Sequence, residues 1–229
     1  STHCISSAAS DVYKRQLLNI PPQTSTIASH LPKSVGMAFS IDRAKDLNIS
    51  GQIAKSSSIV LCSFGDASVN HATALSAFNT ASWITSRGGH VPIIFICEDN
   101  GLGISVKTGD NWIEDNFKSK PGINYIKTDG LNILDLITNS KKAEKACRIN
   151  RSPIFLHMKT VRLMGHAGSD IELGYRELQD VEANEFNDPL LHSARIVIEN
   201  KCLPKEDVLK LYELSSQRKP PENKSCRWD

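Results

Sequence analysis

Short apolar runs that each end in a polar or glycine-containing turn constrain the fold of this chain more than any other feature. The runs lie at residues 58–64, 92–97, 123–127 and 153–159. The first two are continuously apolar, as in strands that are buried on both faces. Segments with helical spacing separate the runs. This alternation predicts an α/β fold with a doubly wound, mostly parallel sheet.

The spacing of small and apolar residues predicts helices over 25–47, 69–86 and 133–148. Ser25 or Thr26 can cap the first helix, and the pair Gly88-Gly89 closes the second. We expect residues 177–217 to form two C-terminal helices, with breaks near Asn187-Asp188-Pro189 and Leu203-Pro204.

The two ends of the chain do not follow this pattern. Residues 1–16 are rich in serine and alanine, and DVYKRQ at 11–16 is what the end of a common transposase-type sequencing adapter encodes in one reading frame. We therefore expect 1–16 to be an assembly artefact, with a disordered native tail as the alternative. Residues 17–217 are then the folded domain, truncated at its N-terminus, and 218–229 a linker or truncated end.

Charge, hydropathy and cysteine spacing argue against several function classes. Lys and Arg total 27 against 25 Asp and Glu and are dispersed, which does not suggest a nucleic-acid surface. No apolar run reaches the roughly 18 residues of a membrane span. The six cysteines stand far apart with no C-x-x-C pair, which favours reduced thiols and a cytoplasmic location.

Polar side chains follow the two most apolar runs. Asp66 comes directly after the first run, and Asn100 follows the second. Ligands of open α/β sheets bind beyond the carboxyl ends of strands, where such residues gather. Carboxylate and amide oxygens suit Mg²⁺, and a helix beginning near Val69 would aim free N–H groups at an anion. Each motif alone is more often an ordinary turn, so the pairing of two strand ends carries this interpretation.

Four ordered motifs resemble one family. GDASVNHA at 65–72 and CEDNGLGIS at 97–105 look like the thiamine-diphosphate motif, with its usual GDG and NN ends altered to GDA and DN. With STIASHLPKSVG at 25–36 and RLMGHAGSDIELGYR at 162–176, the chain is similar to the alpha chain of 2-oxo-acid dehydrogenases from about residue 24 to 217. The motifs look closest to those of bacterial 2-oxoisovalerate-type enzymes, some of which fuse their alpha and beta chains.

The resemblance implies a cofactor, thiamine diphosphate, and a metal, Mg²⁺. It makes Asp66, the Asn100 side chain and the Leu102 main-chain carbonyl the metal ligands. At the diphosphate, the resemblance implies the backbone N–H groups of Ala67 and Ser68 and the Arg162 guanidinium. It makes Ile104 the wedge that bends the cofactor and places Ile27 near the thiazolium. It makes His166 the catalytic histidine over the cofactor. Ser29 matches a position near a monovalent-cation site in some relatives.

Residue type alone leaves blander interpretations open. His166 is then a surface-loop histidine, Arg162 a solvated charge, and Ile27 and Ile104 core residues. We expect His71 to begin a helix, and His30 is a further candidate for lining the site.

The resemblance also implies a reaction and the partner proteins that it needs. The reaction is oxidative decarboxylation of a 2-oxo acid, a branched-chain one favoured, with acyl transfer to a lipoyl group of a partner acyltransferase. A beta chain or beta half supplies a catalytic glutamate, in an alpha2beta2 assembly or a fused homodimer, so we expect the isolated chain to be inactive. The alternatives are a pyruvate- or acetoin-type dehydrogenase, a transketolase-like carbon transfer and a non-catalytic relic.

Mitochondrial relatives are switched off by phosphorylation in the loop that corresponds to 162–176. Ala167, after His166, and Gly174, before Tyr175, have no hydroxyl group and cannot be phosphorylated, so we expect this phosphorylation control to be absent. Ser169 remains, and we expect Asp170, Tyr175 and Arg176 to order the loop with it through hydrogen bonds.

Overall fold

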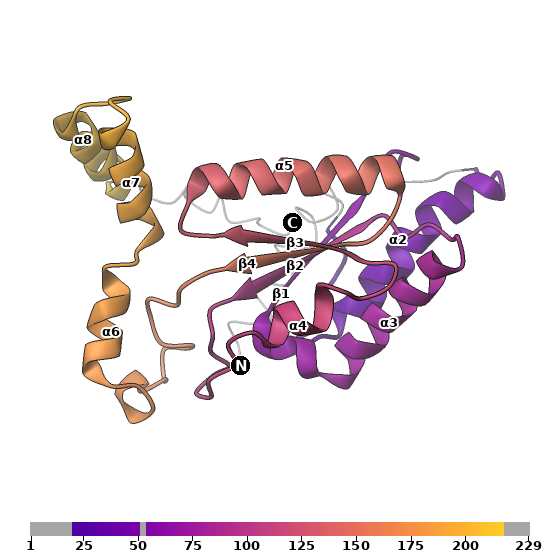
Figure 1. The fold of residues 1–229 in the computed structure, drawn as a ribbon, viewed down its shortest axis with the longest axis horizontal. Coiled ribbons are helices and arrows are strands. Elements are labelled where there is room, and N and C mark those ends of the chain that lie inside the picture. Colours follow the sequence, from indigo (N-terminus) through magenta and orange to yellow (C-terminus); the bar gives the residue numbers. More distant parts are fainter. Residues whose placement is uncertain (1–19, 51–53, 218–229) are drawn as a thin grey trace, which may run out of the picture.

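A four-stranded parallel sheet organises the chain (Figure 1). The computed structural model describes residues 20–50 and 54–217. In sheet order, the strands are β1 (Val60–Gly65), β2 (Ile93–Asp99), β4 (Ile154–Lys159) and β3 (Asn124–Asp129). All three pairs of neighbours run parallel. The predicted α/β class is therefore confirmed, and the four predicted strands lie where the apolar runs indicated.

Helices cover both faces of the sheet, as doubly wound topology requires. Helices α2 (His30–Asp46), α3 (Ala72–Ser86) and α4 (Trp112–Phe117) lie on one side, and α5 (Ile133–Asn150) lies on the other (Figure 1). The chain passes from β2 to β3 on the α4 side and returns to β4 through α5. This change of side creates a topological switch point between β2 and β4, at the centre of the sheet.

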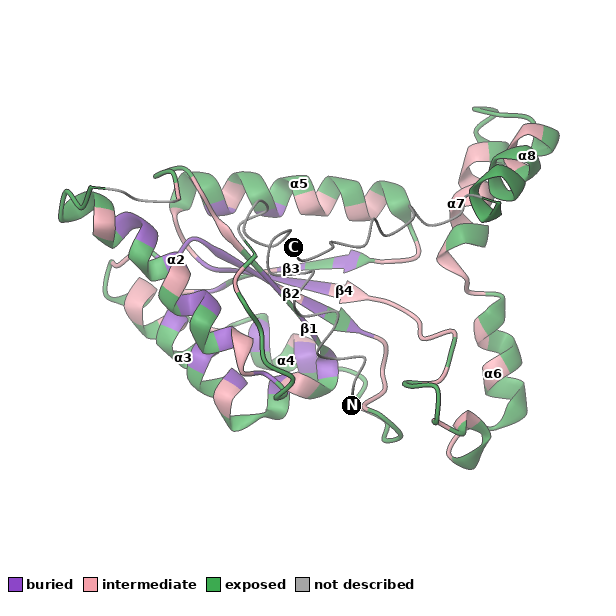
Figure 2. Ribbon diagram, turned by 180° about the vertical axis from the view of Figure 1, so that it is seen from behind, coloured by how far each residue is buried: buried purple, intermediate pink, exposed green. Residues whose placement is uncertain are grey.

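Each face of the sheet has its own core (Figure 2). On the α2–α4 side, Phe78, Phe95 and Phe155 are at most 1% exposed, and the Phe78 and Phe95 ring centroids lie 5.0 Å apart, edge to face. Under α5, Ala143 and Cys147 pack against the alternate residues of β2 and β4. Because successive strand residues point to opposite faces, the central strands supply both cores, which explains their continuous apolar sequence.

The first two predicted helices begin later than their sequence pattern indicated. Helix α2 starts at His30, after Ala28 adopts a left-handed backbone with φ 61°. A 3₁₀ helix, η1 (Asp66–Asn70), precedes α3, and the extended backbone of His71 separates the two. The His71 ring caps α3, since Nδ1 accepts a bond from the Thr73 N–H at 3.2 Å, so the expectation for His71 is confirmed.

The C-terminal region has three helices rather than the expected two: α6 (Leu178–Glu185), α7 (Pro189–Glu199) and α8 (Lys205–Ser216). The prediction was wrong because each of the two sequence breaks ends a helix. Asp188 caps α7 by accepting a bond from the Leu190 N–H at 2.7 Å, with Pro189 in the first turn. The three helices lie beyond the carboxyl ends of the strands (Figure 1).

The predictions for residues 1–16 and 218–229 lie outside the described residues. Within the described ranges, no helix combines the length and the apolar character needed to cross a membrane. Cys62, Cys97 and Cys147 are buried free thiols. Burial raises the pKa of the Cys147 thiol to about 11 and that of Cys97 further, so both keep their protons at neutral pH.

Candidate functional site

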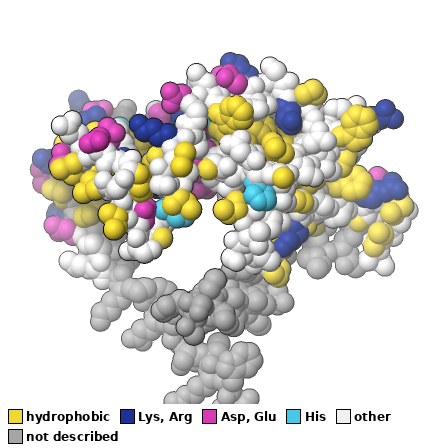
Figure 3. All heavy atoms as spheres, turned by 90° about the horizontal axis from the view of Figure 1, so that it is seen from below, with side chains coloured by type: hydrophobic (Ala, Val, Ile, Leu, Met, Phe, Trp, Pro, Cys, Tyr) yellow, Lys and Arg dark blue, Asp and Glu magenta, His cyan; other side chains and the backbone are white. Residues whose placement is uncertain are grey.

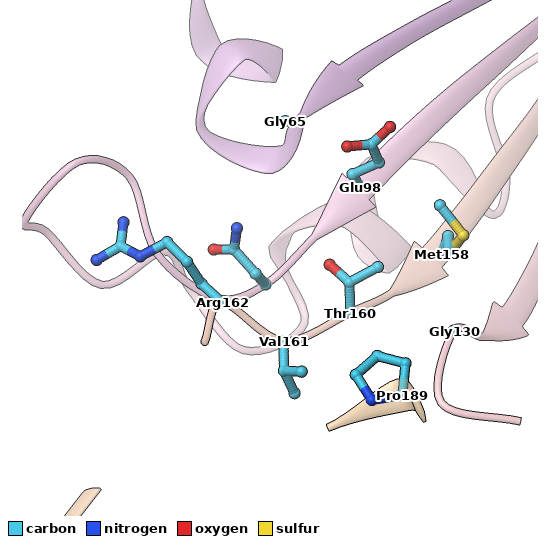
Figure 4. A pocket seen from close by; sticks show the side chains of 9 residues that line it. Gly65, Glu98, Gly130, Met158, Thr160, Val161, Arg162 and Pro189 are labelled. Carbon is cyan, nitrogen blue, oxygen red and sulfur yellow. The ribbon is translucent and has the colours of Figure 1, made fainter. Parts of the chain in front are cut away.

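The carboxyl ends of all four strands border one cavity of about 370 Å³ (Figure 4). Gly65 ends β1 and is paired in register with Glu98 of β2, which in turn is paired with Met158 of β4. Gly130, which follows β3, closes the row. The loops after the strands add Asn100, Thr160 and Arg162 to the cavity wall. The predicted concentration of polar residues at this edge is therefore present.

Asp66 is the most deeply buried carboxyl group at this edge, with 2% exposure. Its Oδ2 accepts a bond from the Thr108 hydroxyl at 2.5 Å. Burial raises the pKa of the Asp66 carboxyl, the Thr108 bond opposes the rise, and the neighbouring Asp99 carboxylate adds to it. Asp99 has Lys159 as its counter-ion at 2.7 Å, whereas Asp66 has no cationic side chain bonded to it among the described residues, so a buried Asp66 carboxylate favours a bound cation.

The turn after β2 brings Asn100 and Leu102 together. Asn100 Oδ1 accepts a bond from the Leu102 N–H at 2.9 Å, and Asp99 Oδ1 accepts one from the Gly101 N–H at 3.1 Å. Gly101 has φ 76°, a left-handed backbone that glycine adopts without strain. Two successive side-chain turns therefore hold the Asn100 amide at the strand end.

The loop that follows this turn folds back onto η1. The Gly103 N–H donates to the Val106 carbonyl at 2.7 Å, and the Thr108 N–H donates to the Gly101 carbonyl at 3.0 Å. A side chain added at Gly103 would meet the Ala67 Cβ at 3.5 Å. Ala67 is exposed and Ser68 half-buried in η1, beside this loop. The structure thus brings the candidate residues of the two strand ends into one neighbourhood.

Arg162 lines the cavity and holds the same loop. Its Nη1 donates to the Gly103 and Ile104 carbonyls, both at 2.9 Å, and its Nη2 donates to the Tyr175 hydroxyl at 2.6 Å. Its Nε is buried and finds no partner among the described residues. Arg162 is therefore not the freely solvated charge that its residue type allowed, and one buried donor remains for an anionic ligand.

The loop of His166 is ordered through Asp170. Asp170 Oδ2 accepts bonds from the Tyr175 hydroxyl at 2.6 Å and from the His166 N–H at 2.7 Å. These bonds lower the pKa of the Asp170 carboxyl, with Tyr175 as the larger cause. The His166 ring is exposed and is not part of the cavity wall. Asp170, Tyr175 and Arg176 order the loop through hydrogen bonds as expected, with His166, Arg162 and Glu172 as their partners in place of the expected Ser169.

Ile27 and Ile104 are not core residues, since they are 59% and 56% exposed. The structure joins Ile104 to the site through its carbonyl on Arg162, whereas Ile27 lies before α2 and away from the cavity wall. The His30 ring donates from Nε2 to the Ser63 carbonyl at 2.9 Å, which ties α2 to β1 near the site. The Ser29 hydroxyl bonds to that of Thr24 at 2.6 Å.

Two residues at this edge escaped the sequence analysis. Glu98 lines the cavity from β2 (Figure 4). The period of two in a strand could have found it, because Glu98 precedes Asn100 by two positions. Thr108 reaches Asp66 only because the loop after β2 folds back, and no local sequence pattern predicts that return.

Comparison with known proteins identifies the family. A family model described as "Dehydrogenase E1 component" matches residues 11–218. The chain belongs to the dehydrogenase E1 component family. The resemblance inferred from the four motifs is confirmed by this match.

The curated relatives of this chain are named either as pyruvate or as 2-oxoisovalerate dehydrogenase subunits. The chain is 27% identical over 82% of its length to the pyruvate dehydrogenase E1 component subunit alpha of Dictyostelium discoideum, covering 46% of that protein. It is 30% identical over 69% of its length to the 2-oxoisovalerate dehydrogenase subunit alpha of Caenorhabditis elegans, covering 34%. It is 28% identical over 80% of its length to the pyruvate dehydrogenase E1 component subunit alpha of Rickettsia conorii, covering 52%. The E1 chain thus spans between a third and about half of these relatives.

Proposed function

We propose that this chain is the alpha part of a thiamine-diphosphate-dependent 2-oxo-acid dehydrogenase. In the reaction, the substrate loses its carboxylate as CO₂ and its 2-oxo carbon becomes an acyl group. That oxidation is matched by reduction of the lipoyl disulfide of a partner acyltransferase to a thioester and a thiol. The observation that carries the proposal is that Asp66 and Asn100 follow the ends of the adjacent strands β1 and β2, in a chain of the E1 family.

The residues at this edge fit Mg²⁺ and a diphosphate. The proposed metal ligands are Asp66, the Asn100 side chain and the Leu102 carbonyl, an all-oxygen set of the kind Mg²⁺ prefers. The buried Asp66 carboxyl group supports a cation here, because the side chain that donates to it is the neutral Thr108 hydroxyl, whereas Asp99 already has Lys159 as its counter-ion. The diphosphate would lie against the N–H groups of Ala67 and Ser68 and the Nε of Arg162, which is a free buried donor.

The chain's residues would orient and protonate, while the cofactor carries the bond-breaking chemistry. When bound, thiamine diphosphate supplies the nucleophilic carbon and the electron sink for decarboxylation. Ile104, exposed beside the Arg162 contact, would support the cofactor in its bent form. His166 would hold a proton near the 2-oxo oxygen, since its backbone is fixed by Asp170 while its ring stays exposed. Ile27, which is exposed ahead of α2, would lie near the thiazolium.

We propose a branched-chain 2-oxo acid as the substrate, on the motif resemblance and on the 2-oxoisovalerate dehydrogenase relative at 30% identity. The pyruvate dehydrogenase relatives, at 27% and 28%, favour pyruvate as the second candidate. The two acids differ by two methyl groups on one carbon, and each carbon changes transition-state binding by about 1–3 kcal/mol, so the size of the acyl pocket decides between them.

The proposed partners are a beta chain or beta half and the lipoyl-bearing acyltransferase. Several large hydrophobic side chains are exposed on the C-terminal helices, among them Leu190, Leu191, Leu209, Leu211 and Tyr212. On the face drawn in Figure 3, hydrophobic side chains are interspersed with charges of both signs. The buried reduced thiols support a cytoplasmic location.

The proposal is tested with the complete enzyme that contains this chain. Purified enzyme is supplied with Mg²⁺, thiamine diphosphate and a lipoylated acceptor, and either pyruvate or 3-methyl-2-oxobutanoate. We expect CO₂ release that requires thiamine diphosphate, with a higher kcat/KM for the branched substrate. A higher kcat/KM for pyruvate would leave the proposed reaction class unchanged but make pyruvate the preferred substrate. Absence of turnover with both acids, in enzyme that is folded and saturated with cofactor, would contradict the proposal.

A further inference from the structure

A row of hydrogen bonds, buried at its centre, crosses three strands next to the candidate metal site. The Tyr125 hydroxyl of β3 lies 2.5 Å from His157 Nδ1, and His157 Nε2 lies 2.6 Å from Asp99 Oδ2. The side chains of His157 and Asp99 are 3% and 5% exposed. Lys159 Nζ adds an ion pair to the same Asp99 oxygen at 2.7 Å. The row ends at the residue that precedes Asn100.

The chemistry of the three groups fixes the direction of the bonds. Burial raises the pKa of the Tyr125 hydroxyl, so Tyr125 keeps its proton and donates it to His157 Nδ1. With Nδ1 as an acceptor, the N–H of the His157 ring lies on Nε2 and donates to Asp99. Burial alone would raise the pKa of the Asp99 carboxyl, but the bonds from His157 and Lys159 outweigh it and hold that pKa below its ordinary value. Asp99 is therefore a carboxylate whose orientation is set by its donors.

The fixed carboxylate controls the turn that carries Asn100. While Oδ2 is held by His157 and Lys159, Oδ1 accepts the Gly101 N–H at 3.1 Å. Asn100 lies between Asp99 and Gly101, so its backbone is held by this bond, and its own Oδ1 accepts the Leu102 N–H at 2.9 Å. Histidines and carboxylates placed behind metal ligands commonly orient them in this way.

We propose that Tyr125, His157 and Asp99 position Asn100 for the cation. His157 and Lys159 are also what allows this chain to carry an aspartate at position 99, where the motif it resembles has asparagine. A carboxylate that is 4% exposed would be strongly unfavourable without such partners. The inference rests on the proposed function, because the cation belongs to the cofactor site. All three are positioning residues, since none is proposed to touch the cation.

The test measures Mg²⁺ binding rather than turnover. The complete enzyme is titrated with Mg²⁺ at fixed thiamine diphosphate, and binding is followed by calorimetry. We expect His157→Leu, which removes both ring nitrogens, to weaken Mg²⁺ binding ~10-fold or more, as for other groups behind a metal ligand. His157→Gln retains a donor toward Asp99 and should restore most of the affinity. Tyr125→Phe removes one neutral hydrogen bond and should weaken binding about 2- to 10-fold.

A matched control separates positioning from stability. Lys127→Met breaks an ion pair with Glu114 at 2.7 Å on the same strand as Tyr125, without touching Asp99. It should lower the unfolding temperature and leave the Mg²⁺ affinity unchanged. If Tyr125→Phe and both His157 variants bind Mg²⁺ as tightly as Lys127→Met does, the row is only structural and the inference is wrong. Should His157→Leu fail to fold, the comparison of Tyr125→Phe with Lys127→Met still decides.

The same titration distinguishes failure of the inference from failure of the proposed function. Wild-type enzyme must bind thiamine diphosphate only with Mg²⁺, and Asp66→Asn must lose that binding. If either condition fails, the proposed function is wrong. If both hold while the Tyr125 and His157 variants behave as wild type, only the positioning role is refuted.

Discussion

The hydroxyl of Thr108 lies 2.5 Å from Oδ2 of Asp66, across 42 positions of sequence. This bond joins the loop after β2 to the end of β1, so the two halves of the candidate metal site are closed against each other. Burial raises the pKa of the Asp66 carboxyl, and the hydrogen bond donated by the Thr108 hydroxyl counteracts that rise.

Removing this donor should weaken the cation site. In Thr108→Val the Asp66 carboxyl loses a hydrogen bond, so its pKa rises further and a larger fraction is protonated when Mg²⁺ arrives. We expect Mg²⁺ affinity to fall ~10-fold, the scale of one hydrogen bond to a charged group. Calorimetric titration of the complete enzyme measures the change. Thr108→Ser keeps the hydroxyl and serves as the control. Equal affinities for both variants would show that the bond has no role in the site.

Replacing Arg162 by lysine should not conserve its role. A lysine cannot span the Gly103 and Ile104 carbonyls and the Tyr175 hydroxyl at the same time, because it lacks the planar fork. We expect Arg162→Lys to weaken thiamine diphosphate binding by ~10-fold or more at saturating Mg²⁺, on the scale of losing a charge-assisted pair. The dissociation constant for the cofactor is the measurement. A wild-type value would remove Arg162 from the diphosphate site.

The aromatic core should dominate the stability of the sheet. Phe155 is fully buried and stacks on Phe117 with 3.8 Å between ring centroids. Phe155→Ala should lower the free energy of unfolding by about 3–5 kcal/mol. The same substitution at Phe186, which is 80% exposed, should change it by less than about 0.5 kcal/mol. Urea unfolding followed by circular dichroism compares the two. A similar loss at both positions would contradict the described core.

Glu114 should make stability depend on acid pH. Hydrogen bonds from Lys127 and Lys118 lower the pKa of its carboxyl to about 2. Since the folded-state pKa lies below the ordinary value of 4.5, the stabilisation is present above pH 4.5 and lost as pH falls toward 2. Relative to wild type, Glu114→Gln should therefore be less stable at neutral pH, by a small amount because the pair is exposed. The difference should vanish near pH 2. A difference that does not change with pH would disprove the linkage.

Residues whose positions follow from strand geometry were predictable from the sequence, and residues placed by local backbone conformation were not. Asp66 and Asn100 were predicted to lie at one edge of the sheet because parallel strands end there, and both follow the ends of the paired strands β1 and β2. Helix α4 was missed because six residues are too few for a clear period. The late start of α3 was missed because the 3₁₀ turn and the cap at His71 are set by local backbone conformation.

The row from Tyr125 through His157 to Asp99 was invisible for a different reason. Its members come from three strands, and nothing in any one strand indicates which neighbour its side chain meets. Strand order, with β4 between β2 and β3, creates the contact. The exposure of Ile27 and Ile104 was likewise not predictable, because apolar residues are buried by default.

Asp66 is the proposed ligand of the cation that holds the cofactor. Asp66→Asn preserves the shape of the side chain and removes its charge. In the complete enzyme, the decisive measurement is calorimetric binding of thiamine diphosphate as a function of Mg²⁺. We predict that wild type binds the cofactor only when Mg²⁺ is present and that Asp66→Asn loses this binding while remaining folded. Undiminished Mg²⁺-dependent binding in Asp66→Asn would contradict the assignment of the site.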